Sequence, residues 1–140
     1  MMTFSLKSWP VLGLLCISMA ACAQGNGAPE ASVLLGPEWV VDDIGGRGII
    51  DNSRVTLNFE AEGRSGGKGS CNTYGAGYKT EGSKITFEQP FSTMMACAEA
   101  LMNQERAFFD VLPQIRQFDI ADDGALILTT EDGRTITARR

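Results

Sequence analysis

The chain has 140 residues with 12 basic and 17 acidic side chains, no histidine, and a net charge of −5. This length suits one domain, and the lack of histidine excludes Ser-His and Cys-His catalytic pairs. The positive charges are dispersed, so the basic face that nucleic acid or anionic lipid would require is absent from the sequence.

Residues 1–21 have the layout of a secretory signal peptide. Lys7 precedes the apolar run "PVLGLLCISMAA", which is shorter than the roughly 18–20 residues that span a bilayer. The stretch "SMAAC" resembles the lipobox of bacterial lipoproteins, which implies that Cys22 becomes the first mature residue and carries the lipid. Ala23 after this cysteine favours the outer membrane, facing the periplasm. The alternative is an ordinary cleaved signal and a soluble periplasmic or secreted product.

Residues 22–38 predict a flexible tether, because small and polar residues dominate there and prolines stand at positions 29 and 37. We expect the folded domain to begin at Trp39 and to continue to Arg140.

The sequence of the domain predicts a series of short strands. Residues 39–44 form the first, and apolar side chains alternate with polar ones over 55–59 and 84–87. Residues 117–140 contain three more, separated by Asp-Asp-Gly at 122–124 and Asp-Gly at 132–133, which are hairpin signals. Short strands joined by tight turns predict an antiparallel sheet or barrel.

One segment has the spacing of a helix. Residues 93–112 place an apolar stripe on one face; Ser92 or Thr93 can cap the start and Pro113 ends it. The stripe consists of Met94, Cys97, Ala98, Leu101, Phe108 and Leu112. We therefore expect an α+β fold, in which a curved antiparallel sheet or partial barrel packs on one amphipathic helix.

The stretch "GGKGSCNTYGAGY" at 66–78 concentrates glycines around a lysine and a cysteine. It is not a phosphate loop, because Glu62 stands where that motif needs glycine and Gly69 follows Lys68. The glycines are better explained by a strand that kinks and approaches other backbone closely, and Asn72 can bond its own turn.

Two cysteines, Cys71 and Cys97, remain once the signal is removed and Cys22 is lipidated. In an oxidising compartment we expect them to form a disulfide that joins sheet to helix, and free thiols or redox chemistry are the alternatives. A metal site is not expected, because histidine is missing and no carboxylates are placed beside the thiols. We expect no cofactor.

Glu105 is a charged residue inside the apolar stripe of the predicted helix. A buried carboxylate must be paired, hydrogen-bonded or protonated. The structural interpretation is that it accepts hydrogen bonds from the backbone of a neighbouring loop. The functional one is a polar group at the floor of a ligand pocket.

The segments "WVVDDIGG", "LNFEAEGRSGGKGSCNTYGAGY", "TMMAC" and "ERAFFDVL" together resemble the META/HslJ domain family. The residues that match its pattern are Trp39, Cys71, Asn72, Gly75, Tyr78, Thr93, Met95, Ala96, Cys97, Glu105, Phe108 and Leu112. Ser70 departs from it, since glycine commonly precedes the cysteine. The resemblance implies a small β-rich fold with a packed helix, often secreted or lipid-anchored, and no known catalytic activity. Members are linked to heat shock, novobiocin resistance and motility or secretion phenotypes.

We expect a non-enzymatic envelope lipoprotein that supports envelope integrity or stress response through an envelope protein partner. Asn72, Tyr78, Thr93 and Glu105 are assigned structural polar roles. One alternative is a module that binds an apolar ligand between helix and sheet, near Phe91, Met94 and Met95. Another is an inhibitor of an envelope hydrolase such as lysozyme, acting through the glycine-rich loop 42–53 and Arg47.

Overall fold

The computed structural model describes residue 27 and residues 29–140. The predicted signal peptide and Cys22 lie outside these residues. None of the helices in the described part of the chain combines the length and apolar character that crossing a membrane requires.

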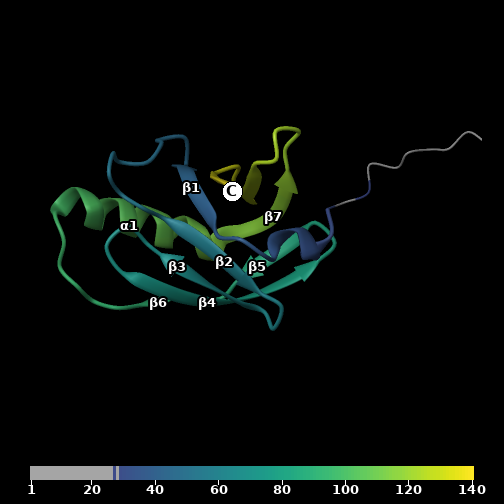
Figure 1. Cartoon of the computed structure of the whole chain (residues 1–140), viewed down its shortest axis with the longest axis horizontal. Coiled ribbons are helices and arrows are strands. Elements are labelled where there is room, and N and C mark those ends of the chain that lie inside the picture. The colour runs from purple at the N-terminus through teal and green to yellow at the C-terminus, as the bar shows by residue number, and fades with distance from the viewer. Residues whose placement is uncertain (1–26, 28) are drawn as a thin grey trace, which may run out of the picture.

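Eight antiparallel strands form a closed barrel (Figure 1). Their order around the ring is β3-β2-β1-β9-β8-β7-β5-β4, and β3 pairs with β4 to close it. The short β6 pairs with β4 beside this ring. The strands are β1 (Trp39–Ile44), β2 (Thr56–Glu60), β3 (Arg64–Lys68), β4 (Thr73–Glu81), β5 (Lys84–Phe87), β6 (Phe91–Ser92), β7 (Ile115–Ile120), β8 (Leu126–Thr130) and β9 (Thr135–Arg139).

The α+β class and the antiparallel strands agree with the sequence prediction, but the barrel is closed rather than partial. The glycine-rich segment lets β3 lie close to both of its neighbours, β4 and β2. A Cβ on Gly66 would lie 2.8 Å from the carbonyl oxygen of Tyr74, and one on Gly67 would lie 2.5 Å from Thr56 Oγ1. The glycines therefore allow the close backbone approach expected of them.

The core lies inside the barrel and against α1 (Glu99–Val111). Alternating strand residues such as Val55, Leu57 and Ile85 are fully buried, as their spacing predicts. Phe108 and Leu112 come from the helical side and are also fully buried. The helix passes into a short 3₁₀ turn, η2 (Leu112–Gln114), at Pro113, because proline cannot continue the α-helical bonding.

The helix begins later than its spacing predicts. Residues 93–98 belong to neither a helix nor a strand, and neither Ser92 nor Thr93 caps α1; its N-cap is Ala98, with no side-chain cap. The backbone of this segment is hydrogen-bonded elsewhere, because Thr93 N donates to Thr73 O at 3.0 Å and Met95 N donates to Asn72 Oδ1 at 2.7 Å. These bonds to the tip of β4 replace the first helical turns.

Folded structure begins before Trp39, within the stretch predicted as a tether. Residues 31–34 form a 3₁₀ turn, η1 (Ala31–Leu34), whose Leu34 is fully buried. Arg140 donates to the carbonyl oxygens of Leu34 (2.9 Å) and Leu35 (2.6 Å), and its guanidinium lies 4.0 Å from the centre of the Trp39 ring. The C-terminal residue thus fixes the N-terminal segment to β1.

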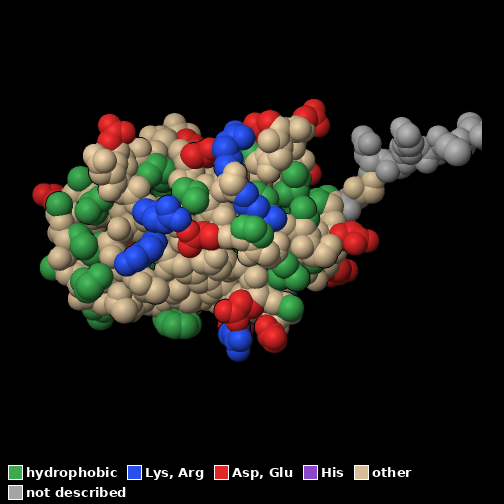
Figure 2. Space-filling model, in the orientation of Figure 1, with side chains coloured by type: hydrophobic (Ala, Val, Ile, Leu, Met, Phe, Trp, Pro, Cys, Tyr) green, Lys and Arg blue, Asp and Glu red, His purple; other side chains and the backbone are tan. Residues whose placement is uncertain are grey.

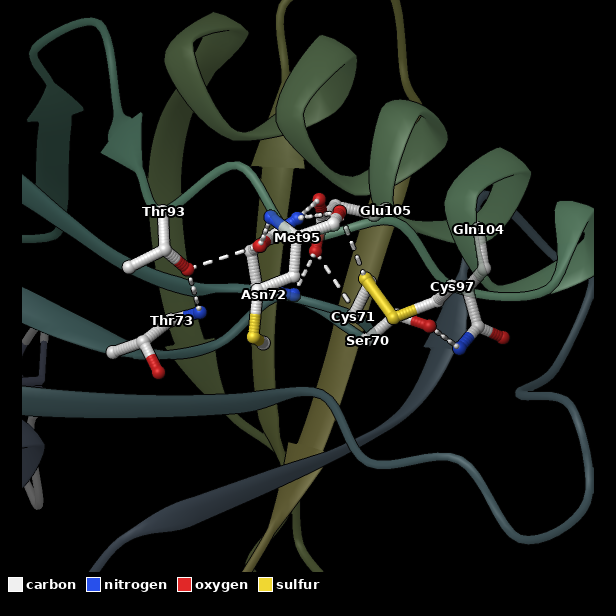
Figure 3. The surroundings of a disulfide bond; sticks show 9 residues. All are labelled: Ser70, Cys71, Asn72, Thr73, Thr93, Met95, Cys97, Gln104 and Glu105. Atoms are coloured by element: carbon white, nitrogen blue, oxygen red, sulfur yellow. Dashed lines mark hydrogen bonds between the residues drawn. A yellow bond between two sulfur atoms is a disulfide. The ribbon is translucent and has the colours of Figure 1, made fainter.

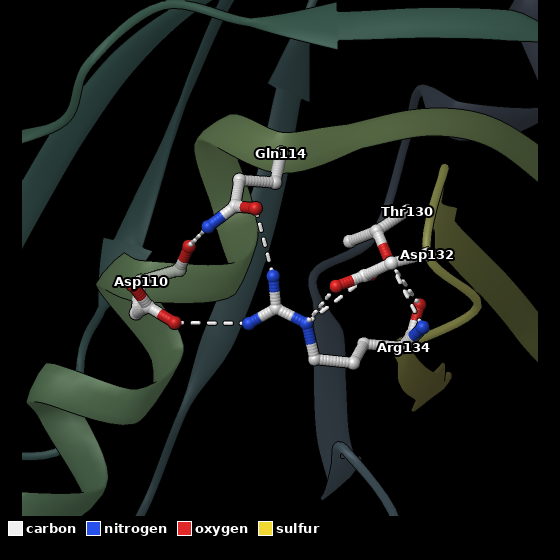
Figure 4. A network of polar contacts seen from close by, with 5 residues as sticks. All are labelled: Asp110, Gln114, Thr130, Asp132 and Arg134. Atoms are coloured by element: carbon white, nitrogen blue, oxygen red, sulfur yellow. Dashed lines mark hydrogen bonds and ion pairs between the residues drawn. The ribbon is translucent and has the colours of Figure 1, made fainter.

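A second arginine holds the C-terminal end of α1 (Figure 4). Arg134 bonds Asp110 at 2.9 Å, Gln114 at 2.7 Å and Asp132 at 3.0 Å. Thr130 and Arg134 also hold the pKa of Asp132 below its usual range through hydrogen bonds. The β8–β9 turn is in this way tied to the helix.

Candidate functional site

A buried polar cluster joins α1 to the tip between β3 and β4 (Figure 3). Glu105 is 8% exposed, and its Oε2 accepts hydrogen bonds from the backbone N–H groups of Cys71 (3.0 Å) and Asn72 (2.6 Å). Its Oε1 accepts a third bond from the Asn72 side-chain amide at 2.7 Å. Glu105 thus accepts hydrogen bonds from the backbone and side chain of a neighbouring loop, as its structural interpretation expects.

Asn72 extends this cluster to the segment before the helix. Its Oδ1 accepts from Thr93 Oγ1 at 3.0 Å as well as from the Met95 backbone. Thr93 Oγ1 in turn accepts from the Thr73 backbone at 3.2 Å. The side chain of Asn72 thus bonds across to two other segments, and only its backbone carbonyl accepts within its own turn, from Gly69 N at 2.8 Å, which corrects the sequence interpretation.

Cys71 and Cys97 form the predicted disulfide, with 5.9 Å between their Cα atoms. Cys97 lies just before α1 and not on its buried face. The bond therefore fixes the extended segment to the β3–β4 tip at a second point, beside the hydrogen bonds of Asn72. Residues 91–97 are consequently ordered at both ends.

Tyr78 has the structural role assigned to it. Its hydroxyl donates to the Glu60 carbonyl at 2.8 Å, and its ring meets Phe59 edge-on at 5.1 Å between centroids. Burial raises the pKa of Tyr78, and of Tyr74, whose hydroxyl donates to the Thr56 carbonyl at 2.9 Å. Both tyrosines tie β4 to β2 across the barrel.

The three proposed ligand-lining residues do not line a space between helix and sheet. Phe91 is 75% exposed, Met94 96% and Met95 53%. These side chains are exposed to solvent, while Phe108 and Leu112 fill the helix–sheet contact. The prediction of an apolar ligand site between helix and sheet is therefore wrong in its location.

Phe91 instead borders an open groove on the outer surface of β2, β3 and β4, with a volume of about 870 Å³. Its ring covers Gly75, where a Cβ would lie 2.6 Å from the ring. Along the rim stand carboxylates of Glu60 and Glu88, together with Arg64, which bonds Glu60 at 2.6 Å. Glycines at positions 66, 75 and 77 make the hollow, because they place no side chain on this face.

Asn58 forms part of the far wall of the groove. Its amide donates to Glu38 at 3.2 Å. A hydrogen bond from Arg54 is the main cause that holds the pKa of Glu38 below its usual range. The carboxylate next to this wall is consequently charged at neutral pH.

Sequence reasoning missed Gln104, which anchors the β1–β2 loop. Its Oε1 accepts from Ile50 N at 2.8 Å, and its Nε2 donates to Ser53 Oγ (2.8 Å) and Ser70 Oγ (3.1 Å). The sequence did contain a signal for this role, since Gln104 is a polar residue next to Glu105 on the buried side of the helix. The loop proposed to protrude into a hydrolase is thus bonded to α1.

Ser70 adopts φ 105°, in the region that favours glycine. This is the position where the META/HslJ pattern commonly has glycine. Ser70 thus adopts a backbone conformation that glycine adopts readily, and its hydroxyl accepts a hydrogen bond from Gln104 at 3.1 Å.

In residues 27 and 29–140, no three His, Cys, Asp or Glu side chains are grouped so that they could hold a metal ion. The buried carboxylate of Glu105 is fully occupied by loop donors. What the arrangement provides is a rigid support for an exposed apolar segment.

These features define an antiparallel barrel domain with one helix, pinned to the sheet by a buried carboxylate–amide cluster and a disulfide. The chain belongs to the META domain family, whose sequence model matches residues 16–140. The fold is similar to the NMR structure of a protein from Burkholderia xenovorans, with a TM-score of 0.65 and 19% identity over 99% of this chain and 98% of the other.

A second NMR structure is similar with a TM-score of 0.57 and 19% identity, over 72% of this chain and 86% of the other. At this identity the two likenesses establish the fold alone. No curated protein matches the chain.

Proposed function

We propose that this protein is a non-catalytic envelope lipoprotein whose META domain docks a partner protein through residues 91–95 and the adjoining groove. The observation that carries the proposal is the exposure of three large apolar side chains, Phe91, Met94 and Met95, within five consecutive residues. Large apolar groups gathered at one exposed place are typical of interaction sites.

The apolar segment is ordered before any partner arrives. Asn72 holds the backbone of Met95 at 2.7 Å, and the disulfide at Cys97 fixes the next turn of chain. Binding therefore costs little additional conformational entropy. Phe91 and the two methionines also supply the adaptable apolar area that protein interfaces favour.

The groove beside the segment indicates the chemistry of the partner. Glu60 and Glu88 contribute two carboxylates to its rim, whereas Arg64 is engaged with Glu60 and lies 3.9 Å from Glu62. The protein as a whole is acidic. A complementary partner presents an apolar side chain flanked by lysine or arginine.

The position of the segment suits a tethered protein. In Figure 1, η1 lies toward the right of the molecule, and residues 93–98 loop around its left end. Figure 2 shows apolar side chains exposed at that left end. A lipid on Cys22 would connect to the domain through η1, at the end opposite to the apolar segment, so the anchor would leave that segment accessible to a partner.

The resemblance to META/HslJ members linked with heat shock supports a role in envelope integrity under stress. The first alternative is an apolar ligand bound between helix and sheet. It is not supported, because core side chains fill the contact between these elements. The second, inhibition of a hydrolase by the loop 42–53, finds no support in the way Gln104 and Asp43 hold that loop.

Site-specific photo-crosslinking in cells tests the docking surface. A benzophenone side chain at position 94 should give a discrete adduct with one protein, and the same group at Lys79, exposed on β4, should not. Phe91→Ser should remove the adduct by deleting the apolar contact. Glu88→Lys should reduce it severalfold by reversing the charge of the rim.

Equal adducts at positions 94 and 79, or adducts insensitive to both substitutions, would contradict the proposal. Both variants change exposed side chains, so unfolding should not confound the result. Mass spectrometry of the membrane fraction tests the anchor separately: a diacylglyceryl mass on Cys22 should vanish in Cys22→Ala.

A further inference from the structure

A cavity of about 370 Å³ lies between the β1–β2 loop and α1, and it shares no residue with the groove beside Phe91. We infer that it binds a small amphiphile with one negative charge: a hydrocarbon chain that ends in a carboxylate. Its volume lies within the range of small-molecule sites, at the lower end of about 300–1,000 Å³.

The walls of the cavity are mainly apolar. From the loop side come Ile44, Ile49 and Ile50, and from the helix come Ala100 and Ala107. The helix residues that line the cavity stand at positions 100, 103, 104 and 107, which is the spacing of one helical face. The two alanines leave the room that larger residues would fill, so the hollow follows from the sequence of α1.

The loop is fixed in place by hydrogen bonds within itself, to β9 and to the helix, and these bonds keep the cavity formed. Asp43 accepts from the backbone of Gly46 at 2.7 Å and of Gly48 at 2.8 Å. Gly45 N donates to Thr135 O at 2.7 Å, and Gln104 fixes Ile50 from the helix. A ligand therefore meets a site that needs little rearrangement.

Arg47 gives the cavity its charge. Within residues 27 and 29–140 it is the one arginine for which the structure shows neither a hydrogen bond nor an ion pair; Arg54, Arg64, Arg106, Arg116, Arg134, Arg139 and Arg140 all have one. The nearby carboxylate of Asp43 is occupied by two backbone donors. A guanidinium with free donors beside an apolar hollow matches a carboxylate on a hydrocarbon chain.

Asn103 supplies a second donor at the same place. Its Oδ1 accepts a hydrogen bond from Arg106, which leaves the amide nitrogen to donate. The cavity thus offers one cation and one amide donor to the carboxylate, and isoleucine and alanine side chains to the hydrocarbon. A neutral alcohol of equal length would contact the isoleucine and alanine side chains but would carry no charge to pair with Arg47.

Titration with octanoate and with octanol, followed by amide NMR shifts, tests the inference. The protein is the full chain exported with its own N-terminal segment and carrying Cys22→Ala, so that no attached lipid competes. Octanoate should shift the amides of Gly46, Gly48 and Ile49 and bind with a Kd of about 1 mM or below. Octanol should bind at least about fivefold more weakly.

Two kinds of variant separate charge from shape. Arg47→Gln should weaken octanoate binding about tenfold and leave octanol unchanged, whereas Arg54→Gln, which removes a cation outside the cavity, should alter neither. Ala100→Leu, at an exposed helix position, should block both ligands with the fold intact. Equal binding of octanoate and octanol, no effect of Arg47→Gln, shifts confined to other surfaces, or no binding would each overturn the inference.

Discussion

Glu105 of α1 accepts the backbone N–H groups of Cys71 and Asn72 with a single oxygen, at 3.0 and 2.6 Å. The two residues lie more than 30 positions earlier in the chain. One carboxylate therefore fixes the β3–β4 tip to the helix, and Asn72 transmits this constraint to the exposed segment at Met95. The stability of the domain and the order of its proposed docking surface depend on the same group.

Glu105→Gln should destabilise the protein by about 2–3 kcal/mol. The amide keeps one oxygen that can accept, but its NH₂ group is a donor and would face the N–H groups of Cys71 or Asn72. Those buried donors would then lack an acceptor. Urea denaturation measures the change. Glu81→Gln, at the exposed end of β4, is the matched control and should cost under about 0.5 kcal/mol; equal effects of the two variants would contradict the role given to Glu105.

The role of Glu105 could be predicted from the sequence, because a charge within an apolar helical stripe must find partners. Which partners it finds could not, since the bonds join residues distant in the chain. The same reason explains the wrong helix start. The spacing of Met94 and Cys97 fits a helix, but these residues lie outside α1, where Asn72 and the disulfide hold the segment against the β3–β4 tip.

Closure of the barrel and the end of the tether also depend on distant contacts. Alternation predicts which strand residues point inward, but not that Lys84 pairs with Gln117 to join β5 to β7. Composition makes residues 31–37 resemble a linker, yet Arg140, about a hundred positions away, bonds their carbonyl oxygens. Contacts between residues so distant in the chain leave no periodic pattern in the sequence.

The disulfide should contribute about 3.5 kcal/mol, given the 26-residue separation of its cysteines. The double variant Cys71→Ala/Cys97→Ala should lose about that much free energy of unfolding in urea. Dithiothreitol should produce a similar loss in the natural protein and none in the double variant. In a chain without residues 1–21 that carries Cys22→Ala, Cys71 and Cys97 are the remaining cysteines, and its reaction with thiol reagents before reduction would refute the bond.

Arg140→Ala should release the η1 segment and cost about 2 kcal/mol. It removes three hydrogen bonds to backbone carbonyls and the contact with the Trp39 ring. Trp39 fluorescence in the chain without residues 1–21, where it is the sole tryptophan, should shift toward that of an exposed indole.

Arg139→Ala is the neighbouring control for this experiment. Arg139 pairs with Asp42 and Asp123 at 2.7 Å, but all three side chains are substantially exposed. Such surface pairs contribute about 0–1 kcal/mol. A loss from Arg139→Ala as large as that from Arg140→Ala, with no change in Trp39 fluorescence in either, would argue against docking of the N-terminal segment.

The two tyrosines of the chain should not ionise in the folded protein near pH 10. Burial raises the pKa of Tyr74 and Tyr78 above the value of about 10 that each has in the unfolded chain. As pH rises, the tyrosines of the unfolded chain lose their protons before those of the folded protein. The stability that the two buried phenols contribute is therefore complete below about pH 10 and falls as pH rises further. Tyrosinate absorbance should therefore rise together with unfolding measured by circular dichroism.

Tyr78→Phe separates the two groups, because the sequence then contains Tyr74 alone. The variant should lose about 1 kcal/mol with the bond to the Glu60 carbonyl. It should also give half the tyrosinate signal, still coincident with unfolding, because Tyr74 is enclosed between β2 and α1. A reversible rise in absorbance near pH 10 with the fold intact would show that the phenols are accessible to solvent, contrary to their burial inside the barrel.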